Sequence, residues 1–425
     1  MQYGLIGEKL GHSFSKIIHE KLADYTYELC PLPRENLHRF MTEKQFCAIN
    51  VTIPYKQMVM PYCDSLHDSA REIGAVNTVV NRGGRLIGYN TDFAGFLYNL
   101  QAHGVVLRGK KVMILGSGGT CKTVAAAARQ LGAREIVVVS RTKQPHTVTY
   151  GECLAHVDTE VIVNASPKGM YPLNDECPLD LSRFPGCVAA VDVIYNPLKT
   201  RFLQQAEQLG IKAVNGLTML VAQAKFAAEY FLDTQMDEAK IAEITQELLA
   251  KLTNIVLIGM PSCGKTLTAK ALCGYIDKAF VDTDAVIEQR AGMSIREIFA
   301  RHGEAYFREL EQEVIAQLAA RNTQIIATGG GAVKLEENMR RLKQNGVVIW
   351  IDRDLDLLQA TDDRPLSGNV DAVRDLYRER YALYRKYADF AVKNNYPLQI
   401  SQPETEELMR NVLEGYREIL CDKWT

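Results

Sequence analysis

The stretch Ile255–Thr266, IVLIGMPSCGKT, places a short apolar run directly before a glycine-rich turn. It satisfies the phosphate-loop pattern G-x-x-x-x-G-K-T, between a predicted buried strand and the start of a helix. The glycines let backbone N–H groups curl around phosphate oxygens, while Lys265 reaches the β- and γ-phosphates and the Thr266 hydroxyl can bind Mg²⁺. We therefore expect ATP to contact Pro261, Ser262, Cys263, Gly264, Lys265 and Thr266.

A second glycine turn, of different design, lies about 140 residues earlier. Lys111–Thr120, KVMILGSGGT, predicts a strand and a glycine turn, and Lys122–Leu131 and Glu135–Val139 predict the helix and strand that follow. This order is the first βαβ unit of a dinucleotide-binding fold, although Cys121 stands where a third glycine is usual. An NAD-preferring fold places Asp or Glu after the second strand, whereas Ser140-Arg-Thr-Lys143 offers cations that suit the 2′-phosphate of NADPH. The alternative is that both cations are merely solvated.

Length and composition limit the possible partners. The chain has 425 residues, enough for about two to four domains. Its 49 Lys and Arg residues nearly balance 51 Asp and Glu residues, so we expect small-molecule partners and neither nucleic acid nor membrane. Ten cysteines without a C-x-x-C pair fit reduced thiols. With no predicted signal peptide and no apolar stretch of about 18 residues, we expect a cytoplasmic protein, and the sequence leaves its oligomeric state open.

Seven ordered blocks in the first part of the chain resemble shikimate dehydrogenase. The blocks are GHSFSKIIH (11–19), NVTIPYK (50–56), GAVNTVV (74–80), GYNTDFAGF (88–96), NASPKGM (164–170), DVIYNPLKTRFL (192–203) and GLTMLVAQ (216–223). The resemblance implies NADPH-dependent reduction of 3-dehydroshikimate to shikimate. It implies that Lys56 and Asp92 form the catalytic pair, with the ammonium stabilising the developing alkoxide or supplying its proton.

The same resemblance implies the binding residues of this first half. The substrate would be held by Ser13, Ser15, Thr52, Lys56, Asn77, Asp92, Tyr195 and Gln223. NADP would be held by Gly116, Ser117, Gly118, Gly119, Arg141, Thr142, Lys143 and Gly216.

From residue 254 to about residue 420 the chain resembles shikimate kinase. After the phosphate loop the matching blocks are FVDTD (280–284), GEAYFRELE (303–311), ATGGGAV (327–333), DDRPL (362–366) and RERYALY (378–384). The resemblance implies ATP- and Mg²⁺-dependent phosphorylation of the 3-hydroxyl of shikimate. Asp284 would deprotonate that hydroxyl, Lys265 and Arg364 would stabilise the transferred phosphoryl group, and Thr266 and Asp282 would hold Mg²⁺, Asp282 through water.

The kinase resemblance also implies how the substrate is held. It would contact Asp284, Arg308, Gly329, Gly330, Gly331, Arg364 and Arg380. The arginine forks suit its carboxylate, and Glu311 would fix Arg308.

These patterns predict an α/β protein of three domains. Residues 1–103, with helices in 217–250 packing back, form a dehydrogenase substrate domain that includes a hairpin over 76–90. Residues 104–216 form a Rossmann-type NADP-binding domain, and residues 254–425 form a P-loop NTPase-type kinase domain with a central parallel sheet. Further strands are predicted over 160–164, 188–193, 279–281, 324–327 and 347–351, and an apolar helix over 219–231.

The sequence departs from both families, and two alternatives stay open. Only about twenty residues lie between SRTK (140–143) and VNASP (163–167), so we expect the NADP-binding domain to lack a helix or strand. An arginine three residues after Arg141 is absent, Lys16 replaces a proline, and the stretch before Arg364 lacks an arginine that stacks on adenine. The dehydrogenase half could instead be a ligand-binding or regulatory module beside an active kinase. Retention of the Lys56 and Asp92 pair disfavours this, and Arg141 with the Ser13 and Ser15 pair disfavours a quinate-type, NAD-using enzyme.

Overall fold

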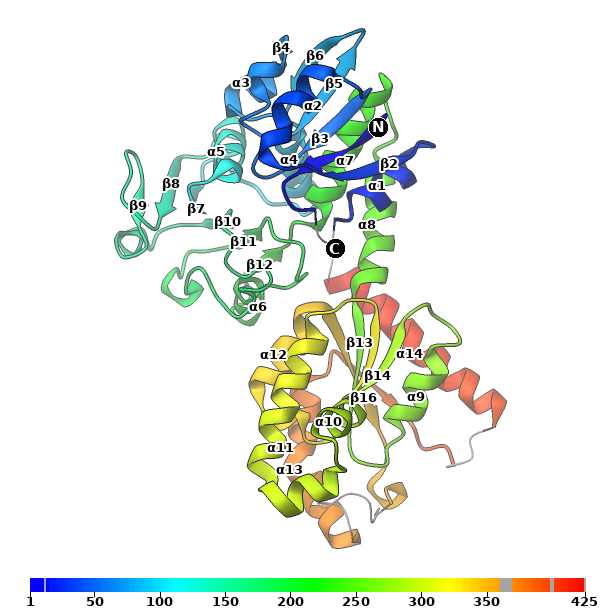
Figure 1. Ribbon diagram of the computed structural model, residues 1–425. Coiled ribbons are helices and arrows are strands. Elements are labelled where there is room, and N and C mark those ends of the chain that lie inside the picture. The colour runs from blue at the N-terminus through cyan, green and yellow to red at the C-terminus, as the bar shows by residue number, and fades with distance from the viewer. Residues whose placement is uncertain (11–12, 360–368, 398–400, 424–425) are drawn as a thin grey trace. The chain divides into compact units, whose positions relative to one another are not determined.

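The chain divides into two compact units, Met1–Glu247 and Leu248–Thr425 (Figure 1). The computed structural model describes residues 1–10, 13–359, 369–397 and 401–423. The first unit holds two six-stranded sheets and the second a five-stranded sheet, which confirms the predicted α/β class. Within the described residues, no helix is long and apolar enough to span a bilayer.

The first sheet carries the blocks expected to bind substrate. Its order is β2-β1-β3-β5-β6-β4; β1 is parallel to β2 and β3, and β5 is antiparallel to β3 and β6. The strands are β1 (Tyr3–Gly7), β2 (Tyr27–Pro31), β3 (Ala48–Val51), β4 (Ser65–Leu66), β5 (Thr78–Arg82) and β6 (Arg85–Tyr89). The helices are α1 (Ser15–Leu22), α2 (Leu37–Glu43), α3 (Asp68–Ile73), α4 (Thr91–Ala102), α7 (Leu217–Leu232) and α8 (Ala239–Leu252). The β5–β6 pair confirms the predicted hairpin, and α7 contains the predicted apolar helix.

The second sheet is parallel throughout, in the order β12-β11-β10-β7-β8-β9. Its strands are β7 (Lys111–Leu115), β8 (Glu135–Ser140), β9 (Val148–Thr149), β10 (Val161–Asn164), β11 (Ala189–Asp192) and β12 (Lys212–Val214), with helices α5 (Gly119–Gln130) and α6 (Arg201–Gln208). This is the doubly wound order of a dinucleotide-binding fold, whose two halves meet at β7 and β10. Residues 141–160, all described, contain β9 and a 3₁₀ turn at Glu152–Ala155 but no α-helix, so the expected missing element is a helix.

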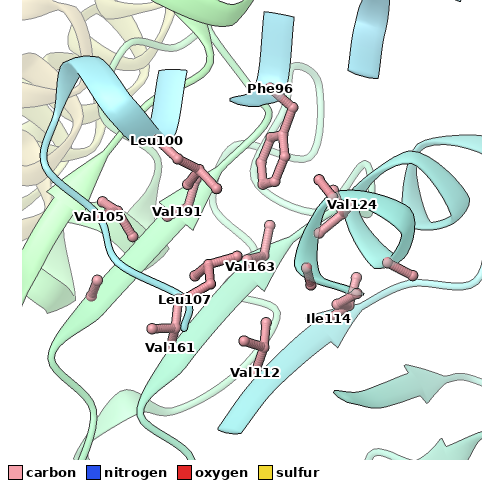
Figure 2. Close-up of a cluster of buried hydrophobic side chains, with 14 of the residues drawn as sticks. Phe96, Leu100, Val105, Leu107, Val112, Ile114, Val124, Val161, Val163 and Val191 are labelled. Carbon is pink, nitrogen blue, oxygen red and sulfur yellow. The ribbon is translucent and has the colours of Figure 1, made fainter. Parts of the chain in front are cut away.

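A buried cluster anchors α4 on the second sheet (Figure 2). Its members from β7, β10 and β11 are Val112, Ile114, Val161, Val163 and Val191. Phe96 and Leu100 of α4 and Val124 of α5 pack against them. Parallel strands need apolar cover on both faces, and here α4 supplies part of it. Helix α4, which contains Asp92 in its first turn, is therefore held against the sheet that carries the dinucleotide loop.

The second unit is built on one parallel sheet, in the order β14-β15-β13-β16-β17. The strands are β13 (Asn254–Ile258), β14 (Ala279–Asp282), β15 (Gln324–Ala327), β16 (Gly346–Asp352) and β17 (Phe390–Lys393). The helices are α9 (Lys265–Leu272), α10 (Thr283–Ala291), α11 (Ile295–Ala319), α12 (Glu336–Asn345), α13 (Val370–Tyr387) and α14 (Gln402–Lys423). Helices α9 and α14 lie on one face, and α12 and α13 on the other (Figure 1).

The end of α8 is bound by a buried cation of the second unit. Lys278 Nζ donates to the carbonyl oxygens of Ala250 at 2.7 Å, Lys251 at 3.1 Å and Thr253 at 2.6 Å. Burial lowers the pKa of Lys278 to about 8. A cation at a helix carboxyl terminus is favourable, and this one satisfies carbonyls that have no partner within the helix.

Candidate active sites

Lys56 and Asp92 form an ion pair in the first unit, as expected for them. Lys56 lies in the segment after β3, and Asp92 lies in the first turn of α4, where the helix dipole favours a carboxylate. Lys56 Nζ is 2.6 Å from Asp92 Oδ2, and the two side chains are 29% and 18% exposed. The pair is thus partly shielded from water and still reachable by a small ligand.

Asn77 and Thr52 lie near this pair. Thr91 N donates to Asn77 Oδ1 at 2.8 Å and Asn77 Nδ2 donates to Thr91 Oγ1 at 3.0 Å, which fixes the buried amide against the start of α4. Thr52 follows β3 directly, and its N–H donates to Ile6 O at 2.9 Å. Asn77 therefore has a fixed side chain and Thr52 a fixed backbone, and a substrate-orienting group needs such support.

Gln223 is brought toward the same end of α4 by close packing of α7. A Cβ at Gly95 would lie 2.8 Å from Met219 O and 2.9 Å from Gln223 Cβ, so only glycine allows the two helices to approach this closely. Gly95 lies three residues after Asp92 and therefore on the same side of α4. The sequence block ending at Gln223 thus meets the block that contains Asp92.

The segment that contains Ser13 and Ser15 contacts Tyr195, which is far away in the sequence. Ser15 N donates to Ser13 Oγ at 3.3 Å at the start of α1. The ring of the intervening Phe14 meets the Tyr195 ring edge to face, with centroids 6.0 Å apart. Burial raises the pKa of Tyr195, so its hydroxyl stays protonated and able to donate.

The loop after β7 has the geometry of a dinucleotide turn. Gly116 has φ 110°, which favours glycine, and its N–H donates to Val139 O at 2.8 Å. A Cβ at Gly118 or Gly119 would meet no atom within 4 Å, so α5 begins at an open surface where a pyrophosphate can approach the backbone. Cys121 is buried in the same apolar cluster as Val124 and fills the place of the third glycine.

The two cations after β8 have different surroundings. Arg141 and Lys143 are both exposed, but Lys143 Nζ lies 2.7 Å from Glu152 Oε2 in the short connection that replaces a helix. Ser117 Oγ and Ser140 Oγ are 3.1 Å apart and tie the glycine loop to the end of β8. Because Glu152 already pairs with Lys143, Arg141 is the better candidate for a 2′-phosphate.

A buried carboxylate joins the loops that follow β10 and β11. Asp192 accepts hydrogen bonds from Thr200 Oγ1 at 2.7 Å, Ile194 N at 3.0 Å and Asn164 Nδ2 at 3.1 Å. Burial raises its pKa to about 7. In the same region a Cβ at Gly216 would overlap Val193 O, so the start of α7 must be glycine. Tyr195 and Gly216 are thereby held at the carboxyl edge of the second sheet, where open α/β sheets bind ligands.

In the second unit the phosphate loop is folded around its own lysine. Lys265 is buried, and its Nζ donates to Gly259 O at 3.0 Å and Met260 O at 2.9 Å. Cys263 Sγ is 3.9 Å from Nζ, and Ser262 adopts φ 63°. The ammonium is therefore preorganised at the centre of the loop, where phosphate oxygens would arrive.

Two carboxylates stand at the end of β14 beside the loop. Thr266 Oγ1 donates to Asp282 Oδ2 at 2.8 Å, and Asp282 Oδ1 accepts from Asp284 N at 3.0 Å as the cap of α10. A hydroxyl and a carboxylate are the hard oxygen ligands that Mg²⁺ takes, so this pair fits the expected metal site. Gly329 brings the next strand end close, because a Cβ there would lie 2.6 Å from Asp284 Oδ1.

The expected carboxylate clamp contains two shielded arginines. Arg308 Nη1 donates to Glu311 Oε2 at 2.8 Å, and burial raises the pKa of Glu311 although Arg308 opposes that rise. Arg380 is 2% exposed; its Nε lies 3.6 Å from Glu379 Oε2, but among the described residues neither Nε nor Nη2 makes a hydrogen bond. Since buried guanidinium hydrogens without a hydrogen bond are costly, Arg380 indicates an anion site. A Cβ at Gly331 would overlap the Arg308 guanidinium, and one at Gly330 would lie 2.9 Å from Pro261 Cδ.

A cleft of about 290 Å³ continues from the phosphate loop. Its walls include Lys265 and Thr266, apolar Leu408 and Met409, and Arg353. An apolar slot beside a phosphate loop suits a flat base. The expected lid residue Arg364 lies outside the described residues.

Comparison with known proteins assigns both units. The chain is 36% identical to the shikimate dehydrogenase (NADP(+)) of Clostridium beijerinckii over 269 residues, which cover 59% of this chain and 98% of the relative. The chain belongs to the shikimate dehydrogenase family. Residues 5–79 match the family model for the shikimate dehydrogenase substrate binding domain, and residues 261–415 match the model for shikimate kinase.

Solved structures agree with the dehydrogenase assignment. A chorismate mutase/shikimate 5-dehydrogenase fusion protein from Clostridium acetobutylicum matches with a TM-score of 0.55 and 39% identity, over 58% of this chain and 96% of that one. The shikimate 5-dehydrogenase of Thermus thermophilus, solved with NADP(H) and shikimate, matches with a TM-score of 0.53 and 32% identity, over 58% and 99%. We call Met1–Glu247 the dehydrogenase unit and Leu248–Thr425 the kinase unit.

Several residues that support the kinase site were not predicted from the sequence. Tyr384 is buried and donates to Gly330 O at 2.6 Å, and Asn394 Nδ2 donates to Cys263 O at 2.9 Å. Arg353 Nη1 donates to Asn394 O at 2.9 Å, which links the cleft wall to the loop. Two signals were present. Tyr384 lies four residues after Arg380 on one helix face, and Asn394 and Arg353 directly follow parallel strands.

Proposed function

We propose that this chain carries out two consecutive steps: reduction of 3-dehydroshikimate to shikimate by the dehydrogenase unit, and phosphorylation of shikimate by the kinase unit. The observation that carries the proposal is the presence in one chain of the Lys56–Asp92 ion pair and a complete phosphate loop around Lys265. Family membership supports the first reaction, and the shikimate kinase match supports the second. The product of the first unit is then the substrate of the second.

In the dehydrogenase unit the protein supplies orientation and a proton. NADPH, when bound, supplies the hydride for the ketone carbon. As the carbonyl oxygen gains negative charge, Lys56 stabilises it and can deliver a proton, while the ion pair with Asp92 holds the ammonium in place. Asn77 is immobilised by Thr91 and is suited to hold a ring hydroxyl in one orientation.

In the kinase unit the residues divide the work of phosphoryl transfer. ATP with Mg²⁺ supplies an activated phosphoryl group, and Thr266 and Asp282 would hold the metal. Asp284, near the start of α10, is placed to accept the proton of the attacking hydroxyl, and Lys265 balances charge on the phosphate oxygens. Arg308 and Arg380 would bind the substrate carboxylate at the opposite side of the ring.

A single mixture tests both reactions. The purified chain is given 3-dehydroshikimate, NADPH, ATP and Mg²⁺, and we expect NADPH oxidation and a phosphate ester of shikimate. Lys265→Ala should stop the sequence at shikimate while NADPH oxidation continues at the same initial rate. If the ester still accumulates with that variant, the phosphate loop does not carry the kinase reaction, and if wild type produces no shikimate, the dehydrogenase proposal is wrong.

A further inference from the structure

A line of alternating charges connects the two arginines of the kinase unit. Arg308 Nη2 lies 3.0 Å from Glu304 Oε1, which lies 3.9 Å from Lys334 Nζ. Lys334 Nζ lies 2.8 Å from Glu379 Oε1, and Glu379 Oε2 lies 3.6 Å from Arg380 Nε. Each cation therefore faces a carboxylate of this chain, in the region expected to receive a carboxylate of the substrate.

Glu304 occupies the part of Arg308 that is best suited to an incoming carboxylate. Its Oε1 accepts from Arg308 Nε at 3.2 Å and from Nη2 at 3.0 Å, along one edge of the guanidinium. Glu311 takes the opposite nitrogen, Nη1. A planar carboxylate binds such an edge with two parallel hydrogen bonds, whereas Glu304 uses a single oxygen for both. A substrate carboxylate on this edge would therefore make the better pair.

The local charge balance makes such an exchange necessary. Among the described residues of this region, the cations Arg308, Arg380 and Lys334 face the carboxylates of Glu304, Glu311, Glu379 and Asp284. A further anion would enter a region that is not positive overall, and like charges at close range repel. Binding becomes favourable once one carboxylate leaves its arginine.

We propose that Glu304 occupies the Arg308 guanidinium until the substrate carboxylate replaces it, and that Lys334 then receives Glu304. The inference rests on the proposed kinase function and adds to it a recognition step, exchange of an internal carboxylate for that of the substrate. Glu304 is a positioning residue here, because it acts through Arg308.

The backbone before Glu304 permits the exchange. Gly303 has φ 81° and ψ 174°, which interrupts α11 directly before Glu304. The peptide N–H and C=O groups at this break are outside the regular helical ladder, so Glu304 can shift without breaking a continuous helix. Glu304 is 40% exposed, whereas Glu311 is fully buried, so only Glu304 can move into water or toward Lys334 at low cost.

The test compares kinase kinetics of full-length variants, measured as ADP formation from ATP, Mg²⁺ and shikimate without NADP⁺, so that the dehydrogenase unit is silent. Glu304→Gln should lower the KM for shikimate about two- to fivefold, the range expected for a partly exposed ion pair, with kcat unchanged. Glu304→Asp should lower KM less, because a shorter carboxylate reaches Arg308 less well. Lys334→Met should raise KM, since it removes the alternative partner of Glu304.

Two controls separate this exchange from a merely structural role. Glu309→Gln removes one negative charge from an exposed position of the same helix and should leave KM unchanged. An uncharged inhibitor, with a hydroxymethyl group in place of the ring carboxylate, should have the same inhibition constant for wild type and Glu304→Gln. A thermal unfolding transition of the kinase unit that matches that of wild type confirms that each variant is folded.

The proposal is overturned if Glu304→Gln leaves KM unchanged or raises it while the kinase unit unfolds at the same temperature as in wild type, because Glu304 would then support Arg308 and not compete for it. If wild type itself forms no ADP with shikimate, the kinase function fails, which is a separate and distinguishable result.

Discussion

At the scale of single residues, Lys56 offers the most direct test of the dehydrogenase unit. We expect Lys56→Ala to lower kcat for 3-dehydroshikimate reduction by about 10²- to 10⁴-fold, the usual loss when a general acid–base group is removed. Lys56 lies in a loop and its side chain is partly exposed, so the fold should remain intact after the substitution. The measurement is NADPH oxidation, with ADP formation in the same preparation as the internal reference. Lys21→Ala, which removes an exposed lysine elsewhere in this unit, should have no effect.

Arg141 should determine cofactor preference. Arg141→Gln removes the exposed guanidinium expected at the 2′-phosphate, and we expect kcat/KM for NADPH to fall about tenfold or more while that for NADH changes little. Lys143→Gln should have a smaller effect, because Glu152 already pairs with that ammonium. Equal losses with NADPH and NADH for Arg141→Gln would contradict the assignment.

Contacts between site residues could be predicted where each partner belongs to a short motif. The Lys56–Asp92 and Thr266–Asp282 pairs join residues named from their own blocks, and the structure places them 2.6 and 2.8 Å apart. The pairing of Lys143 with Glu152 could not be predicted, because it depends on the path of a shortened connection that has no periodic pattern. The contact of Glu304 with Arg308 could not be predicted either, because it depends on the directions of two side chains on an interrupted helix.

At the scale of elements, the loops after β10 and β11 make the stability of the dehydrogenase unit depend on pH. The pKa of Asp192 is raised from 3.8 to about 7, so between these values the folded chain holds a proton that the unfolded chain has lost. Stability should therefore fall as pH rises through this window, by about 1.4 kcal/mol per pH unit, and become constant above pH 7.

The variant that tests this dependence is Asp192→Asn. It retains the shape of the side chain and an oxygen that can accept from Ile194 N and Asn164 Nδ2, while Thr200 Oγ1 can reverse its hydrogen bond. Urea unfolding of the dehydrogenase unit between pH 5 and pH 8 should show a smaller pH slope for the variant than for wild type. Identical slopes would mean that Asp192 does not bind the proton.

The glycine turn after β15 should be essential to the kinase unit for steric reasons. Gly331 has φ −98°, which any residue can adopt, but a Cβ there would overlap the Arg308 guanidinium. We expect Gly331→Ala to raise the KM for shikimate at least tenfold while NADPH oxidation is unchanged. Gly274→Ala is a matched control, because its Cβ would meet only Ala271 O at 3.4 Å.

Elements with strong apolar patterns were predicted closely, and irregular ones were not. The predicted strands over 111–115 and 324–327 coincide with β7 and β15, because continuous apolar runs define buried parallel strands. The break at Gly303 was missed, since a single glycine does not interrupt the apolar period of α11. The two-residue β9 was missed as well, because it is held by pairing with β8 and not by its own sequence.

At the scale of the whole molecule, the second unit begins inside α8. The sequence predicts a kinase domain over residues 254–425, and the carbonyls that bind Lys278 belong to Ala250, Lys251 and Thr253. A fragment 254–425 would leave a buried ammonium without these acceptors, at a cost of about 3–5 kcal/mol. We expect this fragment to have a clearly lower Tm than fragment 248–425 in thermal unfolding.

Lys278→Met provides the control for that comparison. In fragment 254–425 the substitution removes the unpaired charge and should raise Tm, whereas in the full chain it removes three hydrogen bonds and should lower Tm. If Lys278→Met changes Tm in the same direction in the fragment and in the full chain, the carbonyls of residues 250–253 are not what Lys278 requires.

The interaction of Lys278 with α8 also has a consequence for biosynthesis. Translation delivers the carbonyls of residues 250–253 before Lys278, and domains generally fold in the order in which they leave the ribosome. When Lys278 emerges, the three carbonyls that it binds are already part of the chain. The cation can therefore meet its acceptors as soon as it is synthesised, within residues of its own unit.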